Sequence, residues 1–261
     1  MKKLQLAGFL LFLSVMVNAQ NETGAYLFPQ WSSINNKGND DPIYQHIPTV
    51  SAGAGAFFVH YFEGLKISRQ RGRFGYSKPR LGARVDVAYS AHNQKFKSVY
   101  RDGEEQITHH GKKRLDYMKF ALMAEYTRPI NRHMNVVIYG GPQISYLVKA
   151  DGGIVAYKRY DTYDYFDLPT ADKAYFKQYL FDLTASVGVD YKFSKWVNIF
   201  AALRGDWSMT GVEDKDAEAN GIGAYNLDGN DDRSNSHNTM LSITVGVEYK
   251  LHRPEHARTK Y

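Results

Sequence analysis

The sequence predicts an all-β protein, an eight-stranded antiparallel transmembrane β-barrel that follows a cleaved signal peptide. Three observations lead to this prediction: an N-terminus of the export type, long segments that alternate apolar and polar residues, and connections that alternate between short and long. We expect a signal peptide at residues 1–19, an outer-membrane β-barrel at residues 20–251 and a basic C-terminal tail at residues 252–261.

The N-terminus has the three parts of a secretory signal. Lys2 and Lys3 precede an apolar run over residues 4–17, and Val17-Asn18-Ala19 precedes Gln20 as a cleavage site. The run is shorter than the roughly 20 residues that a retained membrane helix needs. The chain has no cysteine, so an exported form is neither a lipoprotein acylated on cysteine nor a disulfide scaffold.

The composition beyond the signal excludes other classes. No later segment is apolar for as long as a membrane-spanning helix, and the mean hydropathy is −0.48. The formal charge falls from +6 to +4 without Lys2 and Lys3, and an exported protein has little access to nucleic acid, so we expect no nucleic-acid partner. The 20 tyrosines and 22 glycines suit strands with interfacial aromatic residues and tight turns.

The clearest strand is YLFDLTASVGVDYKF, from Tyr179 to Phe193. One face is apolar along its whole length, and the opposite face carries Asp182, Asp190 and Lys192. Strands of soluble sheets usually stop after about five or six residues, whereas this one is long enough to cross a bilayer when tilted. Aromatic residues close both ends of its apolar face, as in the girdles of membrane barrels.

Five strands are expected before it, and the first four lie between Thr23 and Thr127. The segment Thr23–Trp31 is the weakest, because Pro29 suits only a strand end or an edge. The segment Thr49–Phe62 is rich in glycine and alanine, which leaves its facing ambiguous and suggests a close approach of strands. The segments Leu81–His92 and Tyr117–Thr127 alternate apolar with polar residues.

Three further strands complete the expected barrel. Val136–Lys149 leads into the long connection before Tyr179, and Val197–Met209 and Met240–Leu251 follow it. Each sets an apolar face against a polar one. The resulting even number of strands agrees with a closed bacterial barrel.

The connections alternate in length. Residues 128–135 and 194–196 are short, whereas residues 93–114, 150–177 and 210–238 are long. Bacterial barrels have short periplasmic turns and long outer loops, so this alternation also orients the barrel. Residues 63–79 are the exception, since they form a longer turn than the periplasmic side needs.

The order of segments resembles a known family. The chain contains, in order, LDYMKFALMAEY, a short turn, NVVIYGGPQISYLV, a long loop, FDLTASVGVDYKF, a short turn, VNIFAALRGDWSM and a final TMLSITVGVEYKL. With Leu115-x-Tyr117, Gly141-Pro142 and Gly188-x-x-Tyr191, this order is similar to the outer-membrane β-barrel family common in Bacteroidota, often called PorT-like. The resemblance implies an outer-membrane barrel, in a family mostly without assigned activity, of which one branch takes part in type IX protein secretion. The long basic turn departs from the family pattern, and no feature selects that branch.

Strand parity places equal numbers of opposite charges in the lumen. An eight-stranded barrel is only wide enough for side chains to fill it, and charges that lose water there must be paired. We therefore expect a salt-bridged plug and no permanent diffusion channel. The charged side chains expected inside are Arg84, Lys119, Lys149, Lys192, Arg204 and Lys250 with Asp86, Glu125, Asp182, Asp190, Asp206 and Glu248.

Enzyme chemistry is not expected, although one set of residues has the types of a Ser/His/Asp hydrolase. Ser90 and His92 share a strand face with Asp86, but neighbours at this spacing are separated by roughly 7 Å of strand rise, too far for a direct nucleophile–base hydrogen bond. His109-His110 lies near acidic residues, yet adjacent histidines on a strand point to opposite faces. The glycine-rich run at residues 51–55 lacks a phosphate-loop lysine. We expect no metal and no cofactor.

The predicted function is that of a structural or interaction protein. Two surfaces are candidates for partner binding: the basic turn, which could bind an acidic partner or lipid headgroups, and an outer loop that interleaves tyrosines with aspartates. A solvated turn and a loop packed on its own rings are the alternatives. Expected partners are outer-membrane lipid and a periplasmic or outer-membrane protein; the competing functions are a lipid- or peptide-hydrolysing barrel and a narrow transporter. The candidate binding residues are Arg69, Arg71, Arg73, Tyr157, Tyr160, Tyr163 and Tyr165.

Overall fold

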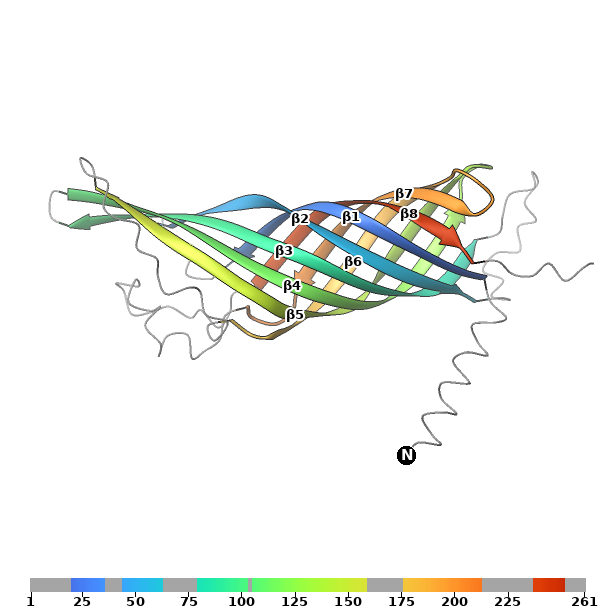
Figure 1. The fold of residues 1–261 in the computed structure, drawn as a ribbon, viewed down its shortest axis with the longest axis horizontal. Helices are drawn as coiled ribbons and strands as arrows, with labels where there is room; N and C mark the ends of the chain where they lie inside the picture. Colours follow the sequence, from blue (N-terminus) through green and yellow to red (C-terminus); the bar gives the residue numbers. More distant parts are fainter. Residues whose placement is uncertain are drawn as a thin grey trace, which may run out of the picture.

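The computed structural model describes residues 20–35, 44–62, 79–102, 105–158, 176–212 and 237–251. Each strand pairs antiparallel with the next, and β1 pairs with β8, so the sheet closes into a barrel (Figure 1). The predicted fold class is confirmed, while the expected signal peptide and basic tail lie outside the described residues. The strands are β1 Gln20–Asn35, β2 Tyr44–Tyr61, β3 Arg80–Asp102, β4 Glu105–Pro129, β5 Met134–Lys158, β6 Tyr179–Lys192, β7 Val197–Ser208 and β8 His237–Lys250.

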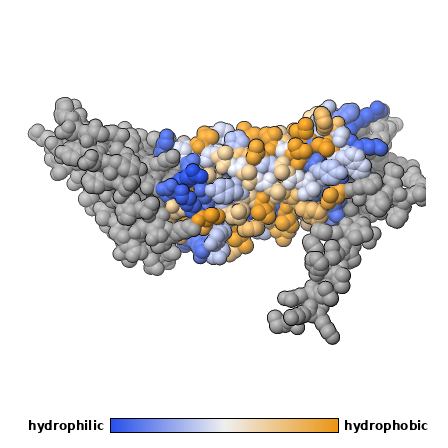
Figure 2. All heavy atoms as spheres, in the orientation of Figure 1, coloured by the Kyte–Doolittle hydropathy of each residue, from blue (hydrophilic) through white to orange (hydrophobic). Residues whose placement is uncertain are grey.

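The outer wall of the barrel is apolar. Along β6, β7 and β8 alternate side chains are exposed, and most of the exposed ones are large and hydrophobic. Figure 2 shows hydrophobic residues gathered over the middle of the barrel on the face in view. Aromatic side chains are exposed toward both ends of the wall, Trp31, Tyr89, Tyr179 and Trp207 at one end and Phe62, Tyr191, Phe193 and Tyr249 at the other. An exposed apolar belt between two aromatic girdles is the surface that lipid covers.

In the portion of the chain that the structure describes, no helix is both long enough and apolar enough to cross a membrane.

Two short turns join strands at one end, which we call the short-turn end. Residues 130–133 join β4 to β5, and there Asn131 Oδ1 accepts hydrogen bonds from the amides of His133 and Met134, both at 2.8 Å. Residues 193–196 join β6 to β7, where Ser194 Oγ accepts from the amide of Val197 at 3.0 Å. Polar side chains that bind the backbone locally explain why the chain reverses there.

At the opposite end three strands are longer than predicted. The expected loop at residues 93–114 is wrong: β3 and β4 stay paired until Asp102 meets Glu105. The expected loop at residues 150–177 starts late as well, because β5 continues to Lys158 beside β4. Outside the membrane both faces of a sheet are wet, so the apolar–polar alternation fades although the backbone ladder continues. Figure 1 shows β3, β4 and β5 running past the rest of the barrel.

Pro29 lies within β1 and not at an end or an edge, so that expectation is wrong. Phe28 and Pro29 pair with Gly53 and Ala52 of β2, whereas the pairing with β8 is interrupted at both positions. A proline lacks only its own donor, and the ladder on the other side of β1 is continuous.

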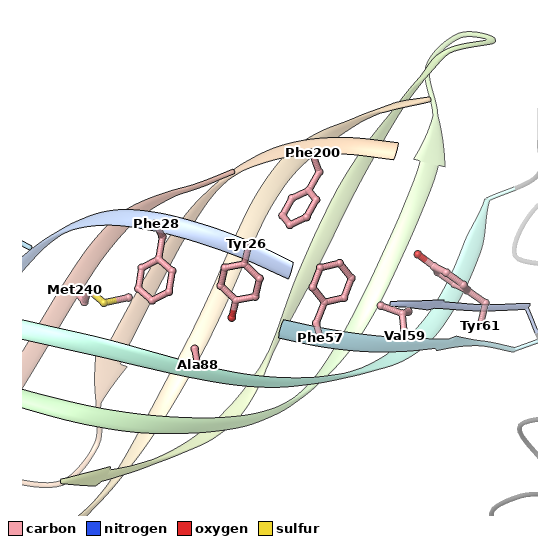
Figure 3. Close-up of a cluster of buried hydrophobic side chains, with 8 residues drawn as sticks. All are labelled: Tyr26, Phe28, Phe57, Val59, Tyr61, Ala88, Phe200 and Met240. Atoms are coloured by element: carbon pink, nitrogen blue, oxygen red, sulfur yellow. The ribbon is translucent and has the colours of Figure 1, made fainter. Parts of the chain in front are cut away.

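The glycines of β2 explain its ambiguous facing. Tyr26 is paired with Gly55, and Phe28 with Gly53, all facing the lumen. A Cβ added at either glycine would overlap the ring opposite it. The glycines therefore make room for lumen aromatics, and at Gly53 the backbone of β3 is close as well, since an added Cβ would lie 2.6 Å from Tyr89 O. Figure 3 shows the resulting apolar side of the lumen: Tyr26, Phe28, Phe57, Val59, Tyr61, Ala88, Phe200 and Met240.

Candidate functional site

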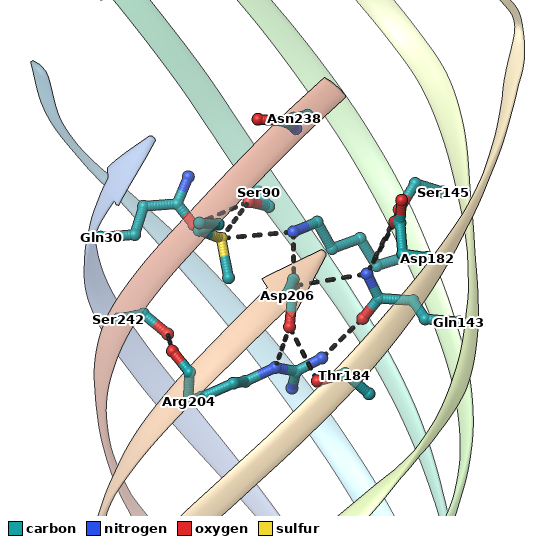
Figure 4. A network of polar contacts seen from close by, with 12 residues as sticks. Gln30, Ser90, Gln143, Ser145, Asp182, Thr184, Arg204, Asp206, Asn238 and Ser242 are labelled. Carbon is teal, nitrogen blue, oxygen red and sulfur yellow. Dashed lines mark hydrogen bonds and ion pairs between the residues drawn. The ribbon is translucent and has the colours of Figure 1, made fainter. Parts of the chain in front are cut away.

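A polar network fills the lumen at the level of Arg204, a β7 residue that is 3% exposed. Its Nη1 lies 3.0 Å from Asp86 Oδ2 on β3, and its Nε lies 3.0 Å from Asp206 Oδ1. Its Nη2 donates to Gln143 Oε1 on β5 at 2.7 Å. One guanidinium thus connects β3, β5 and β7 across the lumen, and Figure 4 shows its contacts with Gln143 and Asp206.

Asp206 is the second centre of this network. Lys119 Nζ of β4 reaches its Oδ2 at 2.8 Å, and Thr184 Oγ1 of β6 donates to its Oδ1 at 2.7 Å. A buried carboxylate that accepts from two cations and a hydroxyl is well compensated.

A second layer lies nearer the short-turn end and centres on Arg84 of β3. Its Nε lies 2.9 Å from Asp86 Oδ1, and its Nη1 lies 3.2 Å from Glu125 Oε2. Its guanidinium also lies over the rings of Phe57 and Tyr139, at 3.7 Å and 4.2 Å from their centroids. The predicted salt-bridged interior is therefore confirmed. A barrel of eight strands has a narrow lumen, and these ion pairs lie inside it.

Other predicted lumen charges occupy different environments. Asp182 is buried, has no ion pair with another described residue, and accepts hydrogen bonds from Ser145 and, at 2.9 Å, from Gln143. Lys192 and Lys250 are half-buried at the short-turn end. Asp190 and Glu248 are buried near them.

The inward placement of Lys149 is wrong. Its side chain is exposed and pairs with Asp151 at 3.3 Å. The β4–β5 register shifts between Asp116 and Tyr117, so that one residue of β5 is extra there. Such a bulge moves every later residue of the strand to the other face, and strand parity read from the sequence fails beyond it.

One lumen ion pair was missed in the sequence. Arg80 Nη1 lies 2.5 Å from Glu22 Oε1. Glu22 precedes the expected first strand and Arg80 precedes the expected third, because both strands start earlier than the apolar alternation does. A more generous strand boundary would have included both residues.

The distance argument against a Ser90–His92 contact is also wrong. Ser90 Oγ lies 3.0 Å from His92 Nε2, because the imidazole spans the strand rise that separates the two backbones. His92 Nδ1 lies 2.8 Å from Asn238 Nδ2. Asp86, in contrast, binds Arg84 and Arg204.

The hydrogen-bond directions around Ser90 do not match a nucleophile and its base. Gln30 Nε2 donates to Ala91 O and Ser51 Oγ, so its Oε1 faces Ser90 and accepts the hydroxyl proton at 2.8 Å. The 3.0 Å contact to His92 is then a bond from Nε2–H to Ser90 Oγ, with Nδ1 accepting from Asn238. A general base needs the opposite tautomer, and Ser90 is fully buried.

The possible metal ligands do not come together either. Within the six described ranges, no group of three or more His, Cys, Asp or Glu side chains could hold a metal ion. His109 and His110 lie on β4, in a strand and not in the expected loop.

The candidate partner-binding residues fall mostly outside the described residues: this holds for Arg69, Arg71, Arg73, Tyr160, Tyr163 and Tyr165. Tyr157 lies on β5, where it is paired with Thr108 of β4.

The free edge of β5 is the main feature of the end opposite the short turns. Its pairing with β6 stops at Tyr146 and Tyr179, and one more bond joins the amide of Leu147 to Gln178 O at 2.9 Å. From Val148 to Lys158, β5 has β4 on one side and no strand among the described residues on the other. At about 3.3 Å per residue this edge is roughly 35 Å long.

Comparison with known proteins gives only distant likenesses. No family model and no curated protein matches the chain. Among solved structures, it is similar to Neisserial surface protein A (12% identity, TM-score 0.37, covering 88% of this chain and 97% of the other). It is also similar to Ail, the attachment invasion locus protein of Yersinia pestis (8%, 0.35, 89% and 99%), and to the N-terminal β-barrel domain of Pseudomonas aeruginosa OprF (9%, 0.33, 90% and 100%). These values are too low to carry an argument about function.

The barrel itself assigns the compartment. A closed antiparallel barrel with an apolar wall, two aromatic girdles and a polar, filled lumen is the architecture of bacterial outer-membrane proteins. The chain is an outer-membrane β-barrel, as the sequence predicts. Short turns face the periplasm in such barrels, so β3, β4 and β5 extend on the outer side.

Proposed function

We propose that this barrel is a structural or interaction protein that presents a β-sheet outside the outer membrane to a protein partner. The observation that carries the proposal is the free edge of β5, Val148–Lys158. A free edge offers a row of backbone donors and acceptors, onto which an extended segment of another protein can add as a further strand.

The composition of this edge favours pairing. Natural edge strands are usually kept short, or carry proline or closely spaced charges that prevent association. The β5 edge is long, has no proline, and is uncharged between Asp151 and Lys158. The proposed tyrosine-rich contact surface begins on it, at Tyr157, and tyrosine gives a large contact area at low entropic cost.

The filled lumen supports the role of an anchor. Arg204 and Asp206 tie β3, β4, β5, β6 and β7 together, which occupies the space that a solute would need. A narrow transporter and a hydrolase remain competing proposals. The contact between Ser90 and His92 is the one observation that favours a hydrolase, and its hydrogen-bond directions oppose it.

The basic turn expected on the periplasmic side supports a second contact there. It contains Arg69, Arg71 and Arg73, whose positive charge would attract an acidic partner. On this proposal the barrel is a subunit that links an outer contact with a periplasmic one.

Site-specific photo-cross-linking in intact cells tests the proposal. A photoreactive residue at Gly153, on the free edge, is compared with one at Lys195 in the exposed turn at residues 193–196. We expect a discrete protein adduct from Gly153 and none of the same mass from Lys195. Absence of a Gly153 adduct, or the same adduct from both positions, would refute strand addition at β5.

The periplasmic contact needs its own variant. Replacing Arg69, Arg71 and Arg73 by glutamine should reduce co-purification of a periplasmic partner while the barrel still folds. Unchanged co-purification would remove that role from the basic turn.

A further inference from the structure

The exposed charged side chains at the short-turn end are all positive among the residues that the structure describes. They are Arg128, Arg132 and Lys195, and none of them forms an ion pair with another described residue. The described acidic side chains of this end are buried inside the lumen: Glu22, Glu125, Asp190 and Glu248. We call the three exposed cations the basic rim.

The opposite end differs, because two of its exposed cations have partners. Arg114 Nε lies 2.8 Å from Asp116 Oδ1, and Lys149 Nζ lies 3.3 Å from Asp151 Oδ2. Surface charge is thus partly balanced there, whereas the basic rim has no counter-charge on the described surface around it.

Arg128 continues the lipid-facing row of β4. Leu122 and Ala124 are exposed on that face, Tyr126 is half-buried, and Arg128 follows two residues later. Its side chain therefore leaves the outer wall next to the aromatic girdle of this end. A long cationic side chain at such a position lays its stem on apolar surface and places its charge among lipid headgroups.

The other two cations lie on turns that the backbone holds beside each other. The amide of Lys192 donates to His133 O at 2.7 Å, which places the β4–β5 turn against the end of β6. The β6–β7 turn starts with the next residue. Arg132 and Lys195 therefore belong to one rim.

Stacked aromatic side chains mark the level of the membrane interface at this rim. His133 stacks on Tyr191, with ring centroids 6.3 Å apart, and Trp196 stacks on Tyr249 at 6.5 Å. Tryptophan and tyrosine concentrate at the level of the headgroups. Cations between them meet the headgroup region of the membrane.

We propose that Arg128, Arg132 and Lys195 bind the headgroups of anionic phospholipids in the periplasmic leaflet. Guanidinium and ammonium groups donate charge-assisted hydrogen bonds to phosphate oxygens, and basic residues next to a membrane surface favour anionic lipid. The site involves neither the free edge of β5 nor residues 63–79, so it is independent of the proposed function.

The test uses the refolded mature barrel in vesicles, with Trp196 as the reporter of lipid at the basic rim. The chain has three tryptophans, and Trp31 and Trp207 are exposed at the opposite end, so the variant Trp31→Phe, Trp207→Phe keeps only the reporter. The vesicles contain equal mole fractions of phosphatidylglycerol and phosphatidylcholine, and only one of the two is brominated in its acyl chains. We expect brominated phosphatidylglycerol to quench Trp196 more strongly, with a binding constant about fivefold larger, the contribution of one cation near an anionic surface.

Charge removal at the rim should abolish this preference. The triple variant is Arg128→Gln, Arg132→Gln, Lys195→Gln. The matched control makes the same change of charge with lysines that are exposed or half-buried at the opposite end, Lys95→Gln, Lys149→Gln, Lys177→Gln, and should keep the preference.

Trp207 provides a second control for position. In the variant Trp31→Phe, Trp196→Phe it is the remaining reporter, and we expect the two brominated lipids to quench it equally. Equal quenching of Trp196 by the two lipids, the same preference at Trp207, retention of the preference in the triple variant, or its loss in the lysine control would each overturn the proposal.

Discussion

Arg204 of β7 and Asp86 of β3 are joined by a 3.0 Å ion pair across the lumen, although 118 residues separate them in the chain. Both side chains are almost completely buried. Because β3 and β7 are not adjacent strands, the pair forms only across the lumen of the closed barrel and not within a hairpin.

Removing Arg204 should take one of two cations from both Asp86 and Asp206 inside the lumen. Arg204→Ala is expected to lower the free energy of unfolding by about 3–5 kcal/mol, the cost typical of breaking a buried ion pair on one side. Urea unfolding in detergent or lipid vesicles would measure it. Lys149→Ala is the control, because its exposed pair with Asp151 should contribute less than about 1 kcal/mol. Equal losses in the two variants would contradict the network.

The purified barrel should not conduct ions. Arg204, Asp206 and Lys119 form ion pairs inside an eight-stranded lumen that is only wide enough for side chains to fill it, so we expect no continuous water path at that level. Planar bilayer recordings should show only the conductance of bare lipid. A reproducible conductance step from purified, folded protein would show that the network opens.

Ser90→Ala should alter stability but not lipids. The substitution removes a buried hydroxyl that bonds Gln30 and His92, with an expected loss of about 1–3 kcal/mol. Profiles of lipid A and phospholipids from cells carrying the variant should equal those of the parent strain. Gln30→Ala disturbs the same network and serves as the control. A lipid profile that changes with Ser90→Ala but not with Gln30→Ala would support the hydrolase proposal.

Gly53→Ala should destabilise the barrel, because its new methyl would overlap the ring of Phe28. Overpacking of this kind typically costs about 1–3 kcal/mol. The matched control is Gly205→Ala, where the nearest atom to the added Cβ is Met240 O at 3.9 Å. Thermal unfolding of both variants should separate them clearly, and similar midpoints would argue against the proposed packing of β1 on β2.

The sequence predicted the features of the strands that the bilayer requires, namely apolar residues on the outer face and polar residues on the inner face. Alternation over Tyr179–Phe193 identified the lipid-facing wall, because each outward residue must be apolar for the whole width of the membrane. Parity then placed Arg84, Arg204 and Asp206 inside correctly.

Prediction failed where the bilayer no longer selects residues. The extension of β3 and β4 to Asp102 and Glu105 has no hydrophobic pattern, because both faces are wet. The bulge that turns Lys149 outward arises from the pairing of β5 with β4. The sequence of β5 alone does not indicate this bulge. The contact between Ser90 and His92 depends on side-chain reach, which a count of backbone rise ignores.

The long sequence separation of the lumen ion pairs has a consequence for assembly in the membrane. Lys119 and Asp206 come from strands that are not neighbours, so neither side chain has this partner while the sheet is still open. A half-formed sheet inserted in lipid would expose these charges to hydrocarbon, which is strongly unfavourable. Removal of water from the lumen and pairing of β1 with β8 are therefore coupled. Insertion should proceed as one cooperative step, in which the barrel closes while the ion pairs form.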